Sequence, residues 1–363
     1  VVEHLPAAQI RQGQELVILR NRLAERPEDA RTAVALARGY IELGRAESDP
    51  RYYGYARAAL TPWWEQTDPP LAVRLLRAII LQALHDFEPA LADLEAVLVR
   101  QPRNAQAWLS RSVVLMVQGE PRRALAGCLR LSRLAHSLVT ATCSAGAVAR
   151  MGRGEEAIDL LDRALQRPGG EPGVRLWALT VQGELAGALG RDAAAETAFQ
   201  EALTLGLRNT YLLGAYADWL LERDRPQEVL KLLEGETRAD PLLLRLALAE
   251  ARLGHSGLER HLGLIRDRMA AARRRGDTLH LREAARATLH LFDDPDRALE
   301  LALENWRTQR EPWDARLVLE AALAADQPAA ARSVLDWIKE TGLEDRTITT
   351  LQRRLEASDH GQG

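Results

Sequence analysis

Cysteine and lysine are scarce in this chain of 363 residues. The two cysteines, Cys128 and Cys143, are too few for a disulfide framework and lack metal-ligand spacing. Lys231 and Lys339 are the only lysines, so almost all of the 48 basic residues are arginine. With 51 acidic residues the net charge is -3, and this balance implies neither nucleic acid nor an acidic membrane as a partner.

Long apolar runs and catalytic motifs are also missing. No stretch approaches the roughly 18 to 20 apolar residues of a spanning helix. Gly-rich phosphate loops, zinc-binding helix motifs, CxxC pairs and EF-hand loops are absent as well. We therefore expect no enzyme activity, no cofactor, no metal and no membrane insertion. The chain begins at Val1 without a leader, which leaves its location unknown; we favour a periplasmic or secreted protein after leader removal over a cytoplasmic one.

What the sequence does contain is a repeat of about 34 residues. A small residue opens a short amphipathic pattern in each copy, and the first five copies are separated by 34, 34, 33 and 38 residues. A second helical pattern that closes on Gly or a polar turn precedes each of them. The recurring small residues are Ala56, Ala90, Ala124, Ala157, Ala195, Ala298 and Ala331.

This pattern resembles the tetratricopeptide repeat (TPR), and we expect a bacterial member of that family. The matching residues fall in three units: Leu36, Ala37, Tyr40 and Gly44; Trp108, Leu115, Gly119 and Ala124; and Gly183, Gly190, Ala195, Phe199 and Ala202. The resemblance implies an all-α, right-handed superhelical solenoid of helix-turn-helix repeats, with about 8-9 units and a C-terminal capping helix. Arg77, Arg111 and Glu228 depart from the family's pattern, and residues 242-276 fit its spacing poorly.

The array is predicted to fall into two parts. Residues 1-166 form an N-terminal array with an insert at 45-54, and residues 174-363 form a C-terminal array that ends in the capping helix. The Pro/Gly-rich segment 167-173 is the expected hinge or loop between them.

In this family the first helix of each repeat lines a concave groove that holds a peptide or a partner helix. The resemblance therefore implies a non-catalytic protein-protein interaction scaffold whose partner is a protein or peptide. The alternatives are a structural or assembly subunit of a bacterial envelope or secretion complex, and a regulatory subunit of an enzyme encoded elsewhere. A homo-oligomer is a further way to cover the groove. The residues expected to line the groove are Arg31, Val34, Arg38, Leu75, Ile79, Leu109, Val113, Met116, Arg150, Trp177, Glu184 and Leu213.

Five of the 17 aromatic residues lie between positions 49 and 66. We expect Asp49 and Pro50 to start the second helix of this repeat early, making it about two turns longer, and Pro62 to end it. Two interpretations of the aromatics remain open. Either one Trp fills the core between repeats and the other Trp, with Tyr52 or Tyr53, forms an aromatic rim patch, or all five plug the gap beside the broken helix. The candidate residues for the patch are Tyr52, Tyr53, Trp63 and Trp64.

Two other features have alternative interpretations. Cys128 and Cys143 fall on neighbouring predicted helices, where they form either a disulfide in an oxidising compartment or two small buried thiols. The Arg-rich tract from Arg245 to Arg286 has no aromatics that could stack on bases. We therefore expect a solvated or acid-paired helical face rather than a nucleic-acid site.

Overall fold

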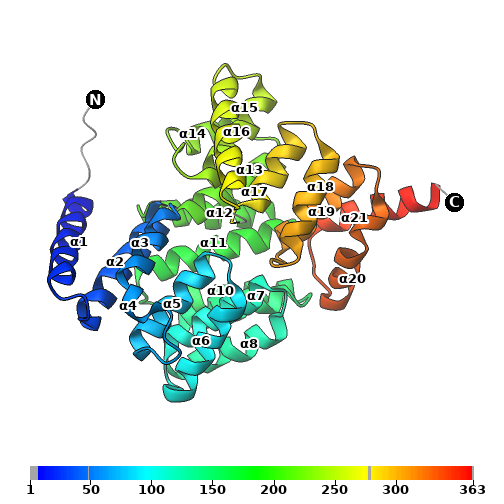
Figure 1. Cartoon of the computed structure of the whole chain (residues 1–363). Helices are drawn as coiled ribbons and strands as arrows, with labels where there is room; N and C mark the ends of the chain where they lie inside the picture. Colours follow the sequence, from blue (N-terminus) through cyan, green and yellow to red (C-terminus); the bar gives the residue numbers. More distant parts are fainter. Residues whose placement is uncertain (1–6, 48, 277–278, 362–363) are drawn as a thin grey trace. The chain divides into compact units, whose positions relative to one another are not determined.

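The computed structural model describes residues 7-47, 49-276 and 279-361, and all regular structure within these ranges is helical (Figure 1). Consecutive helices pair and stack along the chain, so the predicted all-α helical-repeat fold is confirmed. Close contacts divide the chain into unit 1, residues 1-111, and unit 2, residues 112-363, with the boundary inside helix α7. Segment 167-173 joins two helices of unit 2, and the hinge placed there stays a prediction.

Unit 1 is built around two antiparallel helix pairs, α2 with α3 and α5 with α6. Ala33, Ala37 and Ala56 are fully buried between the helices of the first pair, where small side chains allow the backbones to approach. The helices of this unit are α1 (Ala7–Glu25), α2 (Ala30–Glu47), α3 (Arg51–Ala59), α4 (Thr61–Trp64), α5 (Leu71–Ala83), α6 (Phe87–Arg100) and the first part of α7 (Ala105–Val117).

The insert at 45-54 lengthens a different helix from the one expected. Helix α2 continues to Glu47, and α3 has only 9 residues, so the prediction of a longer second helix is wrong. Asp49 accepts a hydrogen bond from the backbone N–H of Arg51 at 3.0 Å and fixes the start of α3. Pro62 does interrupt the helix, because α3 ends at Ala59 and a separate short helix begins at Thr61.

Unit 2 continues the same pattern of paired helices. After the end of α7 it contains α8 (Pro121–Arg130), α9 (Ser137–Ala149), α10 (Gly154–Leu165), α11 (Pro172–Ala188), α12 (Asp192–Thr204), α13 (Thr210–Glu222), α14 (Pro226–Leu232), α15 (Asp240–Leu253), α16 (Leu258–Arg274), α17 (Leu281–His290), α18 (Pro295–Trp306), α19 (Pro312–Ala324), α20 (Arg332–Thr341) and α21 (Arg346–Gly361). Two short 3-10 helices, η1 (Leu131–Arg133) and η2 (Pro328–Ala331), lie among them.

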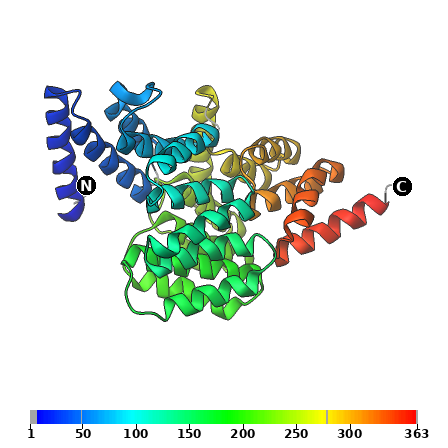
Figure 2. The same ribbon diagram turned by 90° about the horizontal axis from the view of Figure 1, so that it is seen from below.

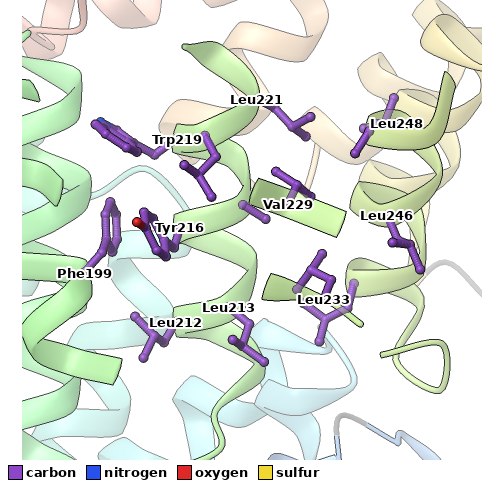
Figure 3. Packing of buried hydrophobic residues seen from close by; sticks show 14 of the residues in the cluster. Phe199, Leu212, Leu213, Tyr216, Trp219, Leu221, Val229, Leu233, Leu246 and Leu248 are labelled. Atoms are coloured by element: carbon purple, nitrogen blue, oxygen red, sulfur yellow. The ribbon is translucent and has the colours of Figure 1, made fainter. Parts of the chain in front are cut away.

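The core of unit 2 shows why small residues recur. A Cβ atom on Gly183 of α11 would lie 2.7 Å from the ring of Phe199 on α12, so only glycine allows this approach. Phe199 in turn stacks on Tyr216 of α13, with ring centroids 5.1 Å apart. Figure 3 shows these rings continuing into a leucine-rich layer shared by α13, α14 and α15. Each repeat therefore buries its apolar face against the next.

The array in unit 2 closes back on itself. The backbone N–H of Arg310 donates to the carbonyl oxygen of Val117 at 2.7 Å, and the indole N–H of Trp337 points to the carbonyl oxygen of Gly119 at 3.4 Å. The Glu344 carboxylate accepts from the N–H of Gly154 at 3.0 Å.

Further along, Arg346 pairs with Asp192 at 3.2 Å. The start of α21 accordingly lies beside the green helices in both views (Figures 1 and 2). We call these contacts between the α18–α21 region and the earlier inter-helix turns the closure seam.

A disulfide joins Cys128 of α8 to Cys143 of α9. Both residues are fully buried. Of the two interpretations of the sequence, the disulfide is the one that the structure contains.

Candidate functional site

The predicted groove residues differ widely in exposure. Arg31 and Arg38 are exposed, whereas Ile79, Met116 and Leu213 are buried. The remaining positions are half-buried: Val34, Leu75, Leu109, Val113, Arg150, Trp177 and Glu184. The exposed groove positions thus lie in unit 1. In unit 2, several of the predicted groove residues contact other side chains of the same chain.

The first helices of the pairs in unit 2 share a network of charged side chains centred on Asp218. Asp218 of α13 is only 3% exposed and accepts hydrogen bonds from Arg245 of α15 at 2.5 Å and from Arg286 of α17 at 2.6 Å. Burial alone would raise the pKa of Asp218, but the two guanidinium groups hold it below its usual value. These pairs account for the ends of the Arg-rich tract, which are bound to acids as expected.

Trp313 of α19 extends this network. The guanidinium of Arg286 lies 4.5 Å from the Trp313 ring centroid, and that of Arg316 lies 4.2 Å from it. Arg316 also pairs with Glu320 at 2.7 Å and with Glu222 of α13. The indole between two guanidinium groups thus connects α17 and α19, and the Glu222 pair reaches back to α13.

The start of α19 carries a second group of charges. Arg282 of α17 bonds to Asp314 at 2.6 Å and to Glu311 at 2.7 Å. The Glu311 carboxylate also accepts from Arg150, at the end of α9, at 3.2 Å. Burial would lower the pKa of Arg282, yet Asp314 and Glu311 hold it well above its usual value. The Glu311 carboxylate therefore joins α17 to the end of α9, where Arg150 lies 161 positions before Glu311.

Glu184 of α11 lies near this group. It accepts a hydrogen bond from the hydroxyl of Tyr211 on α13. Burial raises the pKa of Glu184 to about 7, with Glu311 adding to the rise, while Tyr211 and Arg150 oppose it. At neutral pH this side chain is therefore close to half protonated.

These contacts form what we call the inner polar network: Arg150, Glu184, Tyr211, Asp218, Arg245, Arg282, Arg286, Glu311, Asp314 and Arg316. It links α9, α11, α13, α15, α17 and α19, which are the first helices of successive pairs. The helix face that was expected to line a groove is thus bound to the chain's own last repeats in this unit.

In unit 1 the corresponding face is open at α2. Arg31, Val34 and Arg38 are spaced i, i+3, i+7 and share one side of the helix. Within the described residues neither arginine side chain has a hydrogen bond or an ion pair. Val34 lies between them on the same side of α2, and both Val34 and Leu75 of α5 are half-buried and pack on the core of unit 1.

The aromatic residues between positions 49 and 66 are divided between core and surface. Trp63 is 8% exposed and belongs to the core of unit 1, and Trp64 is half-buried with Arg57 4.8 Å from its ring centroid. Tyr52 is half-buried and lies in a group with Tyr40 and Tyr55 (described below), and Tyr53 packs on the core.

In that group the Tyr40 and Tyr52 ring centroids are 6.4 Å apart, and Tyr40 and Tyr55 are 5.6 Å apart. Tyr55, which is 53% exposed, was not among the predicted patch residues. Because Tyr55 follows Tyr52 by three residues on α3, helix geometry could have placed the two tyrosines on the same side of the helix.

The described part of the chain contains neither a metal-ligand cluster nor a candidate membrane span. No group of three or more His, Cys, Asp or Glu there could hold a metal ion. None of its helices has both the length and the apolar character needed to cross a bilayer.

Comparisons with known proteins matched neither a family model nor a curated protein. Among solved structures, the chain is similar to the APC/C hetero-tetramer Cut9-Hcn1 at 12% identity and a TM-score of 0.43, over 97% of this chain and 88% of that one. It is similar to the human IFIT1 dimer with m7Gppp-AAAA at 13% identity and a TM-score of 0.43, over 91% and 77%. For the TPR domain of P58(IPK) the values are 14% and 0.28, over 80% and 99%. Likeness at these levels carries no information about a partner of this chain.

Sequence reasoning missed the polar network and the seam. Arg282, Asp314, Gly342 and Glu344 belong to no repeat motif. Arg282 and Asp314 are 32 positions apart, and Glu344 lies 190 positions from its partner Gly154. Only Arg150 and Glu184 of the network were among the predicted groove residues.

Proposed function

We propose that this chain is a non-catalytic protein-protein interaction scaffold that binds a segment of a partner along the first-helix face of its repeats. The observation that carries the proposal is the pair of exposed arginines on α2, Arg31 and Arg38, which have no acidic partner among the described residues and flank the half-buried Val34 on the same side of the helix. Such a surface offers apolar contact and uncompensated positive charge together.

The spacing of the two arginines defines the partner's chemistry. Seven residues of α-helix place them about 10.5 Å apart along α2. A peptide in the polyproline II conformation rises about 3.1 Å per residue with three residues per turn, so acidic side chains three residues apart share one face and lie about 9.3 Å apart. The partner segment is therefore extended, with two acidic residues at that spacing and an apolar residue between them.

Photo-crosslinking in the full chain tests this proposal. A photoreactive residue at Leu75 should capture the acidic partner segment, and the product should disappear in the Arg31→Glu/Arg38→Glu variant with its helical circular dichroism unchanged. Arg20→Glu/Arg22→Glu on α1 changes the net charge equally and should leave the product intact. A photoreactive residue at Val99, which is 83% exposed on α6, is the matched position outside the face.

Two results would overturn the proposal. One is equal capture from Val99 and Leu75, and the other is capture from Leu75 that survives both charge reversals on α2.

The Cys128–Cys143 disulfide favours a second candidate function. Disulfides persist in oxidising compartments, which agrees with a structural or assembly subunit of an envelope or secretion complex. Fractionation of the source cells tests this candidate, and recovery of the chain from the cytoplasm with both cysteines reduced would eliminate it.

A further inference from the structure

A pocket of about 880 Å³ lies between α15, α16, α17 and α18 of unit 2. In neighbouring repeats the second helix of one pair packs on the first helix of the next, as α14 does on α15 and α18 on α19. Within the described residues α16 and α17 share no comparable contact. The pocket thus occurs where the packing between successive repeats is interrupted, in the region whose sequence fitted the repeat spacing poorly.

The floor of the pocket is apolar and has room because several side chains are small. Leu243 and Leu244 of α15, Ile265 and Met269 of α16, and Leu301 of α18 supply its larger apolar side chains. Alanines from α16 and α17 supply much of the rest. A methionine among alanines adapts readily to an inserted side chain.

The α16 wall carries net positive charge. Of the charged side chains that α16 contributes to the lining, Arg266, Arg268 and Arg273 are basic and Asp267 is acidic. Arg266 stacks on the Phe292 ring at 4.9 Å, and within the described part of the chain neither Arg266 nor Arg273 forms an ion pair. Arg268, by contrast, is held by Asp240 at 2.5 Å.

The α18 wall carries the opposite sign. Arg297 and Glu304 line it together with Leu301, and Arg297 is neutralised by Glu300 at 2.6 Å. Glu304 is exposed and has no ion-pair partner in the described ranges. The pocket therefore presents an apolar floor between a positive wall and a negative wall.

We infer that this pocket docks an amphipathic helix of a partner chain, with acidic side chains facing α16, basic side chains facing α18 and apolar side chains on the floor. A helix about 10 Å in diameter occupying about 880 Å³ would be about 11 Å long, or about two turns. Such a helix supplies the contact that α16 and α17 lack. Unpaired charges of both signs fit this occupant, whereas a lipid-like anion would complement only the α16 wall.

Fluorescence anisotropy with designed helical peptides and the full chain tests the inference. Peptides of about 14 residues share one leucine stripe and carry Glu on one flank and Lys on the other, Lys on both, or Glu on both. A peptide with its Glu and Lys flanks exchanged would be no control. Such a helix can bind in the reverse direction with its leucine stripe still on the floor, which again places Glu against α16 and Lys against α18. We expect the mixed peptide to bind about tenfold more tightly than either uniform one.

Charge reversal on the protein sharpens the test. In Arg266→Glu/Arg273→Glu both walls are negative, so the preference should move to the all-Lys peptide. Arg274→Glu lies on the same helix outside the pocket and should keep the original preference. Hydrogen exchange should show protection in α16 and α18 when the mixed peptide binds.

Three results would overturn the inference: equal affinity for all three peptides, protection elsewhere in the chain, and binding of dodecanoate but of no peptide. None of them bears on the α2 face of unit 1, so this site and the proposed function fail or survive separately.

Discussion

Replacing Gly152 by alanine tests the closure seam more directly than any other single substitution. Gly152 has φ +69°, and a Cβ atom placed on it would lie 2.2 Å from the carbonyl oxygen of Gly342. Ordinary contact begins at 3.4 Å, so this backbone atom must retreat by 3.4 - 2.2 = 1.2 Å. Because it belongs to the α20–α21 turn, the movement strains the neighbouring Gly154–Glu344 hydrogen bond.

Replacing Gly254 by alanine is a control that separates the cost of backbone strain from the cost of displacing the seam. It has φ +60°, and no atom lies within 4 Å of its Cβ position. Gly254→Ala should therefore lose only about 1 kcal/mol from left-handed backbone strain. Gly152→Ala should lose that and a further 1 to 3 kcal/mol, roughly, from the displaced seam and its hydrogen bonds.

Thermal unfolding and hydrogen exchange of the two variants measure the difference. Amides following Gly342 should exchange faster in Gly152→Ala and at the wild-type rate in Gly254→Ala. Equal losses of stability with unchanged exchange in both variants would refute the closure of unit 2.

Two further predictions concern stability. The disulfide closes a loop with a sequence separation of 15, so Cys128→Ala/Cys143→Ala should lose about 3 kcal/mol, or about 6 to 12 °C in Tm; two titratable thiols in denatured, unreduced protein would contradict the bond. The folded pKa of Glu184 lies near 7, above the ordinary 4.5, so its contribution to stability is full below about pH 4.5 and is lost as the pH rises towards 7. Glu184→Gln should remove that dependence and gain about 1 to 2 kcal/mol over the wild type at pH 8, since exposure of Tyr211 screens the effect. An unchanged pH profile of unfolding in Glu184→Gln would show that another group is responsible.

The local packing was predictable because it depends on residues close in the sequence. Gly183 and Phe199 were matched to the repeat pattern, and the structure places the ring where a side chain on Gly183 would lie. Pro62 was expected to interrupt its helix and does so, since the amide it lacks acts within one turn. The irregular spacing at 242-276 marked the region where the pocket between α16 and α17 occurs.

The closure seam could not be predicted from the sequence, because its contacts do not follow the repeat period. Trp337 and Gly119 are 218 positions apart, and their contact depends on curvature summed over every intervening repeat. The cysteine pair is an intermediate case. Adjacent helices put Cys128 and Cys143 within reach, but the sequence did not determine whether a bond forms.

The seam has a consequence for how this protein can change over evolution. An open solenoid gains or loses whole repeats with little penalty, because each repeat contacts only its neighbours. In unit 2 an added helix pair would carry the turn at Gly342 past Gly152, and a deleted pair would leave it short. We therefore expect the number of repeats between these two glycines to be fixed, with variation in length confined to segments outside them.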